Sequence, residues 1–291
     1  MISFRYHLVS VAAILLALAA GVALGAGPLD DAAAGLSDNA NVSGTSADPA
    51  VARFESGYAA RTSGALLKDT LKGKSVVVLT LPGARADEAK NIRAELEKTG
   101  AAVTGEVQLT AKLVDPANRQ FAEGVAQQSA SDVKGVTDAG DSYGRVGTAL
   151  GRSVLGGGGK NLDTAATTIS SAFDEGKLVT YASKPTKFAD LAVVLSGPGR
   201  AGDSGPVSAQ MSKAVDGAGG GAVLAGPSSS SLDGGVLAAL RDSDAATQVS
   251  TVDVTDLAAG RVVVALALSR EADGQSGAWG TSRSADGAVP R

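Results

Sequence analysis

The run SVVVLTL at Ser75–Leu81 is continuously apolar and rich in β-branched residues. Such a run predicts a strand of a parallel sheet that is buried on both faces. Pro82-Gly83 ends it, and Arg85–Thr99 follows with the spacing of an amphipathic helix that stops before Gly100. Ala102–Leu109 (AVTGEVQL) then predicts a second strand. The three segments together predict one strand–helix–strand unit.

A second block of the same kind begins at Asp190. It predicts strands at Leu191–Ser196, Ala222–Ala225, Gln248–Val254 and Arg261–Leu268, and helices at Val207–Ala218 and Leu232–Leu240. Less regular segments between the two blocks predict helices at 116–128, 143–155 and 164–173 and a strand at 178–182. This alternation favours an α/β class, a mainly parallel layered domain. The link Thr255–Gly260 is too short for a parallel crossover, so we expect the last two strands to form an antiparallel edge.

The first thirty residues contain a long uncharged segment, Leu8–Ala26. As a helix it would be roughly 28 Å long, about the thickness of a hydrocarbon core. Arg5 precedes it and Asp30-Asp31 follow, so the N-terminus is expected in the cytoplasm and the bulk of the chain outside. The alternative is a cleaved signal peptide ending near Ala23–Gly25, although such peptides usually have shorter apolar regions. We expect an uncleaved single-pass anchor, and both interpretations export the domain.

These segments divide the chain into five parts. We expect a cytoplasmic start and transmembrane anchor at 1–29, a linker at 30–48, a membrane-proximal helix at 49–72, an exported α/β domain at 73–270 and a flexible C-terminal tail at 271–291. Pro49 suits the first turn of the membrane-proximal helix.

Two surfaces are candidates for association. Phe54 and Tyr58 lie on the membrane-proximal helix, in a chain that is only 3% aromatic, and aromatic side chains are favoured at interface centres. We expect them to contact a partner, either a second copy or another envelope protein; the alternative is that they pack on the α/β domain. Ala17, Gly21 and Gly25 have the small-xxx-small spacing that suits close packing of two transmembrane helices.

The composition excludes several classes of enzyme. The chain has no cysteine and a single histidine, His7, in front of the apolar run. The exported part therefore holds no Ser-His or Cys-His pair and no histidine-based metal site. The 26 Lys and Arg residues against 30 Asp and Glu leave no basic footprint for nucleic acid. We expect a protein without catalytic activity and with no certain cofactor.

Two glycine-rich segments are similar to phosphate-binding loops. Gly197-x-Gly199-x-x-Gly202 follows a predicted strand at the spacing of the dinucleotide fingerprint, but Pro198 interrupts the turn and no acid follows the next strand. Gly156–Gly159 fails the P-loop pattern at Val154 and Asn161. We interpret both as loops, and a degenerate nucleotide-binding module ranks third among the functions.

The opening residues MISFRYHLVSVAAILLALAAGVALGAGPL resemble those of the MctB-like copper transporter family of actinobacteria, which begins Met-Ile-Ser-x-Arg-x-His. Further similar blocks are KSVVVLTLPGA (74–84), DLAVVLSGPG (190–199), STVDVTDLAAGRVVVALAL (250–268) and GAWG (277–280) with the closing Pro290. The resemblance runs nearly end to end. It implies an exported α/β domain of the cell envelope, linked in mycobacteria to copper handling and the outer membrane. A related branch is tied to cell separation with a membrane partner.

Copper chemistry limits what this resemblance implies for single residues. Cu(I) favours Cys and Met, and Cu(II) favours His. Beyond the initiator, Met211 is the one methionine, and its place on an apolar helix face predicts core packing. Copper is therefore expected as a transported ion, by resemblance, and no residue is assigned to bind it. The first expected function is envelope copper transport or homeostasis; the alternative is a non-enzymatic scaffold that binds another envelope protein in cell division or separation.

Overall fold

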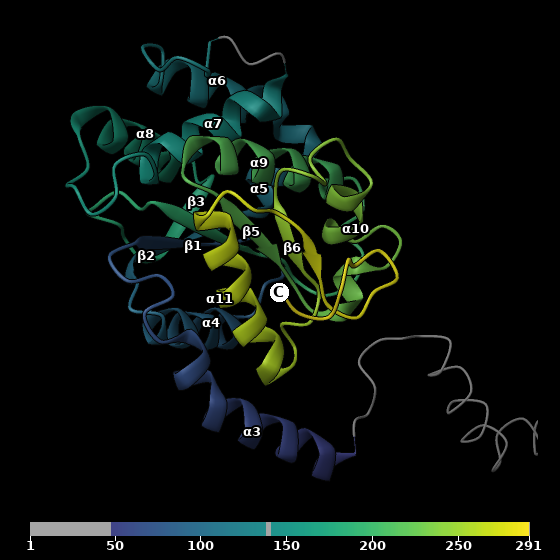
Figure 1. Ribbon diagram of the computed structural model, residues 1–291. Coiled ribbons are helices and arrows are strands. Elements are labelled where there is room, and N and C mark those ends of the chain that lie inside the picture. Colours follow the sequence, from purple (N-terminus) through teal and green to yellow (C-terminus); the bar gives the residue numbers. More distant parts are fainter. Residues whose placement is uncertain (1–47, 138–140, 291) are drawn as a thin grey trace, which may run out of the picture. The chain divides into compact units, whose positions relative to one another are not determined.

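The computed structural model describes residues 48–137 and 141–290 (Figure 1). The predicted anchor at Leu8–Ala26, with Ala17, Gly21 and Gly25, lies outside the described residues. Within the described part of the chain, no helix combines the length and the apolar character needed to cross a bilayer.

One mostly parallel sheet lies at the centre of the described chain (Figure 1). Its strands are β1 Ser75–Thr80, β2 Ala102–Leu109, β3 Val179–Ser183, β4 Leu191–Leu195, β5 Ala222–Ala225, β6 Ser250–Val252 and β7 Ala278–Trp279. Their order across the sheet is β3-β2-β1-β4-β5-β6-β7. Strands β1, β4 and β5 are buried along their whole length, as expected of parallel strands covered on both faces. The predicted strands at Ser75–Leu81, Leu191–Ser196 and Ala222–Ala225 are confirmed.

Helices cover both faces of this sheet. Their bounds are α3 Pro49–Leu67, α4 Ala86–Lys98, α5 Ala111–Val114, α6 Arg119–Ser129, α7 Ser142–Val154, α8 Thr164–Glu175, α9 Ser204–Ala218, α10 Val236–Arg241 and α11 Ala258–Ala272. Figure 1 shows α5 to α10 on one face and α4 with α11 on the other. Alternate residues of each strand supply two cores: Leu79 and Val194 face α5 to α10, while Val78 and Val193 face α4 and α11. The predicted unit β1-α4-β2 is confirmed.

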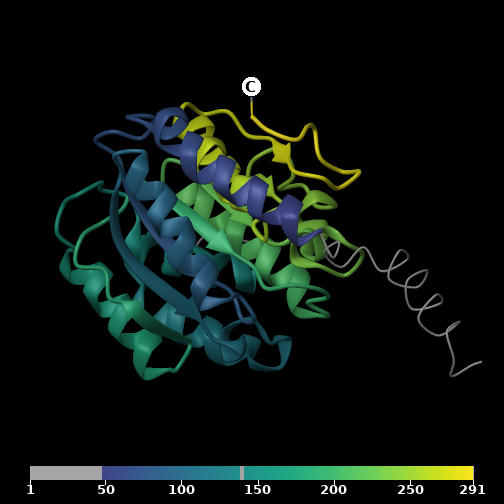
Figure 2. The same ribbon diagram turned by 90° about the horizontal axis from the view of Figure 1, so that it is seen from below.

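The segment Arg261–Leu268 is a helix, so the predicted final strand is wrong. These residues lie in α11, where Val262 to Ala265 are all buried. A short apolar run has the same pattern in a buried strand and in a helix that is buried nearly all round. Here α11 packs between the sheet and α3, which buries it on both sides (Figure 2).

The antiparallel edge exists, but at the other end of the sheet. Strand β3 pairs antiparallel with β2, with Val107 opposite Tyr181. The chain from β6 passes through α11 into β7, which lies parallel to β6 with Thr251 opposite Ala278. The short link Thr255–Leu257 therefore leads into a crossover helix and not into a hairpin.

The C-terminal segment is part of the sheet edge, in contrast to the flexible tail predicted at 271–291. Trp279 in β7 is buried, and the backbone N–H of Thr281 donates to Asp253 at 2.7 Å. Arg241 donates to Asp253 at 2.7 Å and to Ser282 at 2.5 Å. Arg241 and Asp253 are both buried, so this ion pair holds the end of the described chain against β6.

Candidate functional site

The glycine loop lies at the point where the strand order reverses. From β1 the chain passes through α4 to β2 on one side, and from β4 it passes through α9 to β5 on the other. The carboxyl ends of such neighbouring strands are the usual place for a ligand crevice in an α/β sheet. A pocket of about 320 Å³ lies there, lined by Pro82, Gly83, the loop 197–201, Ser204 and Ser208.

Close contact between two loops explains one of these glycines. A Cβ on Gly197 would lie 2.5 Å from the carbonyl carbon of Gly83, so no other residue fits without moving the loops. Gly199 has a φ of 76°, which favours glycine for conformation rather than for contact. The helix α9 begins only at Ser204, and Gly226 follows β5 where the fingerprint requires an acid. The geometry is that of a strand-end loop, as predicted, and gives nucleotide binding no support.

The second glycine segment, Gly156–Gly159, also lacks the context of a phosphate loop. It follows helix α7 rather than a strand, and it packs beside Asp190 at the amino end of β4. A P-loop joins the carboxyl end of a strand to a helix. The loop interpretation is therefore confirmed.

A buried carboxylate lies near the carboxyl end of the sheet. Glu88 on α4 is buried and accepts a hydrogen bond from the hydroxyl of Thr255, which follows β6. The pKa of Glu88 is raised to about 7, mainly by burial; the charge of Arg85 opposes this rise and that of Asp256 adds to it. The Asp256 carboxylate in turn accepts from the backbone N–H and the hydroxyl of Ser228, each at 3.3 Å. These groups join the loops after β5 and β6 to α4.

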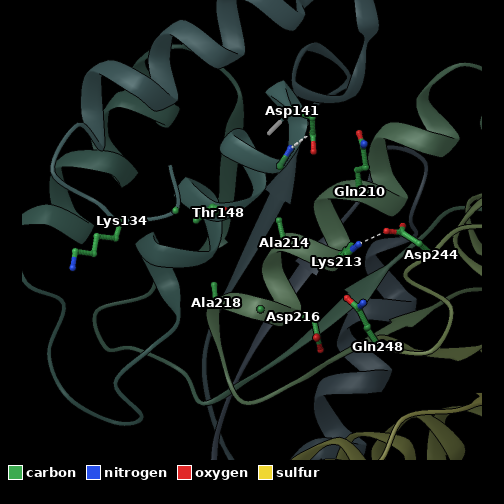
Figure 3. Close-up of a pocket in the computed structure, with 13 residues that line it drawn as sticks. Lys134, Asp141, Thr148, Gln210, Lys213, Ala214, Asp216, Ala218, Asp244 and Gln248 are labelled. Atoms are coloured by element: carbon green, nitrogen blue, oxygen red, sulfur yellow. Dashed lines mark hydrogen bonds and ion pairs between the residues drawn. The ribbon is translucent and has the colours of Figure 1, made fainter. Parts of the chain in front are cut away.

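A larger pocket, of about 560 Å³, lies between α7, α9 and the loop before β6 (Figure 3). Its carboxylates are already engaged: Asp141 accepts from Gly144 N–H at 2.6 Å, and Asp244 pairs with Lys213 at 2.6 Å. Asp216 accepts from the N–H of Ala222 at 2.7 Å, and burial raises its pKa to about 6. The three carboxylates of this pocket thus have partners in helix α7, helix α9 and strand β5.

Carboxylates hold the amino ends of three strands. Asp190 accepts from Ser75 N–H at 2.8 Å, and Glu271 accepts from Ser250 N–H at 2.7 Å, as Asp216 does at β5. Burial raises the pKa of Glu271 to about 7, with a smaller contribution from the charge of Asp216. These acids have structural partners at short distance. The partners of Asp190 and Glu271 lie 115 and 21 residues away along the chain, so the role of these two acids was not visible in the sequence.

The described residues include no cysteine, and their one soft side chain is buried. Met211 is 1% exposed within the core, as predicted. His7 lies outside the described residues. Within residues 48–137 and 141–290, no three acidic or histidine side chains come close enough together to hold a metal ion. Oxygen donors are the remaining ligand type, and the carboxylates of the larger pocket, Asp141, Asp216 and Asp244, already have hydrogen-bond or ion-pair partners.

The two residues predicted to contact a partner are exposed to solvent. Phe54 is 73% exposed and Tyr58 is 63% exposed, and their rings stack with centroids 6.3 Å apart. They do not pack on the α/β domain, and whether a partner covers them stays a prediction. Leu66, which helical spacing had placed on one face with Phe54, Tyr58 and Leu67, is exposed, whereas Leu67 is buried. Val51 is also exposed on α3, although no pattern in the sequence singled it out. Glu55 carried no sequence signal either, yet its carboxylate accepts from the first N–H groups of α11.

Comparison with known proteins agrees with the resemblance in the opening residues. The family described as "Copper transport outer membrane protein, MctB" matches residues 1–290. The chain is 30% identical over 311 residues to proteins named copper transporter MctB from Mycobacterium bovis and Mycobacterium tuberculosis, with 98% of each chain covered. It is 29% identical over 310 residues to the Mycobacterium leprae protein of the same name, again with 98% coverage. The chain therefore belongs to the MctB family of copper transport proteins.

Proposed function

We propose that this chain serves copper transport and copper homeostasis at the cell envelope. The observation that carries the proposal is the family match over residues 1–290 together with alignments that cover 98% of the chain. Similarity over the whole length includes the opening block, the sheet and the C-terminal segment. The proposal therefore concerns the complete chain and not one domain of it.

In this proposal copper is cargo, and the chain acts on it without catalysis. The sequence has no cysteine, and its one non-initiator methionine is buried in the core. Since Cu(I) needs thiolate or thioether ligands for tight binding, a single described domain offers it no strong site. We propose that the segment Leu8–Ala26 anchors the chain, with the N-terminus in the cytoplasm and the α/β domain exported. The domain would then support copper movement through an assembly rather than through a soft-ligand site of its own.

Deletion of the gene tests the function. The deletion strain is plated on a copper series, and cell-associated copper is measured by mass spectrometry of washed cells. We expect growth to fail at lower copper and cell-associated copper to rise, with both effects reversed by the intact gene. A zinc series is the control, because a general envelope defect would alter sensitivity to both metals.

Neither of the other expected functions gains support from the described residues or from the comparisons. A scaffold in cell separation predicts chained cells with unchanged copper tolerance, and that result would overturn the proposal. Nucleotide binding has no support in the geometry of the Gly197–Gly202 loop.

A further inference from the structure

The pocket at the carboxyl ends of β1 and β4 contains a buried hydroxyl group without a partner. Ser208 of α9 lines this pocket and is 2% exposed, and none of the described residues forms a hydrogen bond with its hydroxyl. In the described chain, the unpaired side-chain oxygens that are fully shielded from solvent belong to Tyr143 and Ser196. The Ser208 oxygen is not one of them, so it keeps access to solvent, and the pocket that Ser208 lines provides this access.

A ligand in this pocket would supply the missing hydrogen bond. Buried polar groups in folded proteins are almost always hydrogen-bonded, so the free hydroxyl requires a partner. The carboxyl ends of neighbouring strands, where the strand order reverses, are the usual ligand position in an α/β sheet. The volume of about 320 Å³ is at the lower end for small-molecule sites, and the buried side chains of Leu81 and Val236 provide apolar walls. The pocket therefore suits a small organic molecule with a polar group.

Two backbone donors in the same pocket also lack partners. Gly83 follows β1 and Gly197 follows β4, and none of the described residues accepts from either backbone N–H. The two glycines lie against each other, since a Cβ on Gly197 would be 2.5 Å from the carbonyl carbon of Gly83. The N–H of Gly199, by contrast, donates to the Ser229 hydroxyl at 3.1 Å. Free N–H groups need an acceptor, so the ligand should present oxygen atoms to this end of the pocket.

The charge of the pocket favours an anion. Among the described residues that line it, Arg200 is charged and none is acidic. The Arg200 side chain is 78% exposed and lies 3.9 Å from Asp233, and an exposed ion pair of this kind contributes little, so Arg200 can turn toward a ligand. Ser204, the first residue of α9, lines the pocket as well, which adds the positive end of the helix dipole. The first N–H groups of α9 donate to the preceding loop, so the free donors come from the strand ends.

We propose that this pocket binds a small organic anion through its carboxylate or phosphate group. The Ser208 hydroxyl and the N–H groups of Gly83 and Gly197 donate to the ligand oxygens, and Arg200 balances the charge. Hydrogen bonds to an ionised oxygen are roughly twice as strong as those between neutral groups. The site goes beyond the proposed copper function and does not depend on it.

A dinucleotide and a neutral sugar fit the same pocket less well. The pocket is small for a dinucleotide, and Gly226 follows β5 where an acid would bind the ribose. A sugar donates from several hydroxyl groups and needs acceptors for them. The described lining residues include no carboxylate or amide side chain. Unpaired donors beside a cation therefore favour an anion.

Equilibrium dialysis of the full chain in detergent micelles tests the proposal with two radiolabelled probes, malonate and inorganic phosphate. We expect one of them to bind at one molecule per chain with a Kd below about 10 mM, and the tighter probe identifies the group that the site prefers. Malonamide, which resembles malonate without its charge, should not compete. Equal competition by malonamide would overturn the proposal. Absence of saturable binding for both probes would also overturn it, because water would then be the partner of the Ser208 hydroxyl.

Two serines of α9 give a matched pair of variants. Ser208→Ala removes the free hydroxyl, whereas Ser212→Ala removes an equally buried hydroxyl that donates to the Ser208 carbonyl at 2.8 Å. We expect the affinity for the bound probe to fall at least about tenfold in Ser208→Ala and to stay within about twofold in Ser212→Ala. Arg200→Gln should lower the affinity at least about fivefold, while Arg283→Gln, exposed in the C-terminal segment, should not. Equal affinities for the two serine variants, or for the two arginine variants, would place the anion elsewhere and overturn the proposal.

Discussion

Replacing Glu88 by glutamine should stabilise the protein at alkaline pH and have no effect in acid. Glu88 is buried on α4 beside the hydroxyl of Thr255. Burial is the largest cause that raises the pKa of its carboxyl group from 4.5 to about 7. The net value of about 7 includes opposing effects of nearby charges: Arg85 and Arg261 lower the pKa, and Asp256 and Asp87 raise it. Glutamine keeps the oxygen that accepts from Thr255 and has no charge to bury.

The size and sign follow from proton linkage. The folded state binds the Glu88 proton more tightly than the unfolded chain does, so the free energy of unfolding falls as pH rises from about 4.5 to about 7. A tenfold change in proton affinity corresponds to 1.36 kcal/mol, which gives a penalty of about 3 kcal/mol above pH 7. Below about pH 4.5 the group is neutral in both states and the penalty disappears. Glu88→Gln should therefore gain at most about 3 kcal/mol at pH 8 and nothing at pH 4.5.

Urea unfolding of the full chain, followed by fluorescence, measures this difference. Trp279 is the single tryptophan and is buried, so its emission reports unfolding. Glu97→Gln is the control, because Glu97 is exposed on the same helix, and its effect should stay within about 0.5 kcal/mol at both pH values. An equal gain for Glu88→Gln at pH 4.5 and pH 8, or a loss at pH 8, would refute the reasoning.

Three further predictions use the same purified chain. Gly197→Ala should lose about 1–3 kcal/mol in urea unfolding, because its Cβ would meet Gly83, while Gly124→Ala in open space on α6 should not destabilise. Arg241→Met should lose about 3–5 kcal/mol and expose the C-terminal segment to protease, since it leaves Asp253 buried without its cation; unchanged protease resistance would contradict this. Titration with Cu(I) and with Cu(II) against a chelator should detect no stoichiometric site tighter than about 1 μM, and a tighter site would show that oxygen donors suffice.

The first strand–helix–strand unit could be predicted because its signals are local. SVVVLTL is too apolar for a surface strand, and Ala89, Ile92 and Leu96 share one helix face that is buried as expected. The segment Arg261–Leu268 could not be assigned in the same way. An apolar run without polar alternation fits a strand buried on two faces and a helix buried on two sides equally well. The packing of α3 over α11 decides between them.

The same distinction between local signals and long-range contacts applies to the candidate site. The failure of the Gly197–Gly202 loop as a nucleotide site was visible in the sequence, because a required acid was missing. The buried charge of Glu88 was not visible, because Thr255 lies 167 residues away along the chain. Phe54 and Tyr58 were recognisable as candidate contact residues, but the sequence left open whether the domain covered them.

The sequence alone determines which metal-binding side chains the chain contains, the first strand–helix–strand unit and the family to which the chain belongs. None of these depends on contacts between segments far apart along the chain. The tertiary structure alone decides which carboxylates are buried and which face of α3 stays uncovered. A helix that is apolar on two sides carries no signal of its own for the side that meets the domain. That choice comes from Glu55 and Ser63, whose partners on α11 and α4 are brought near only by folding.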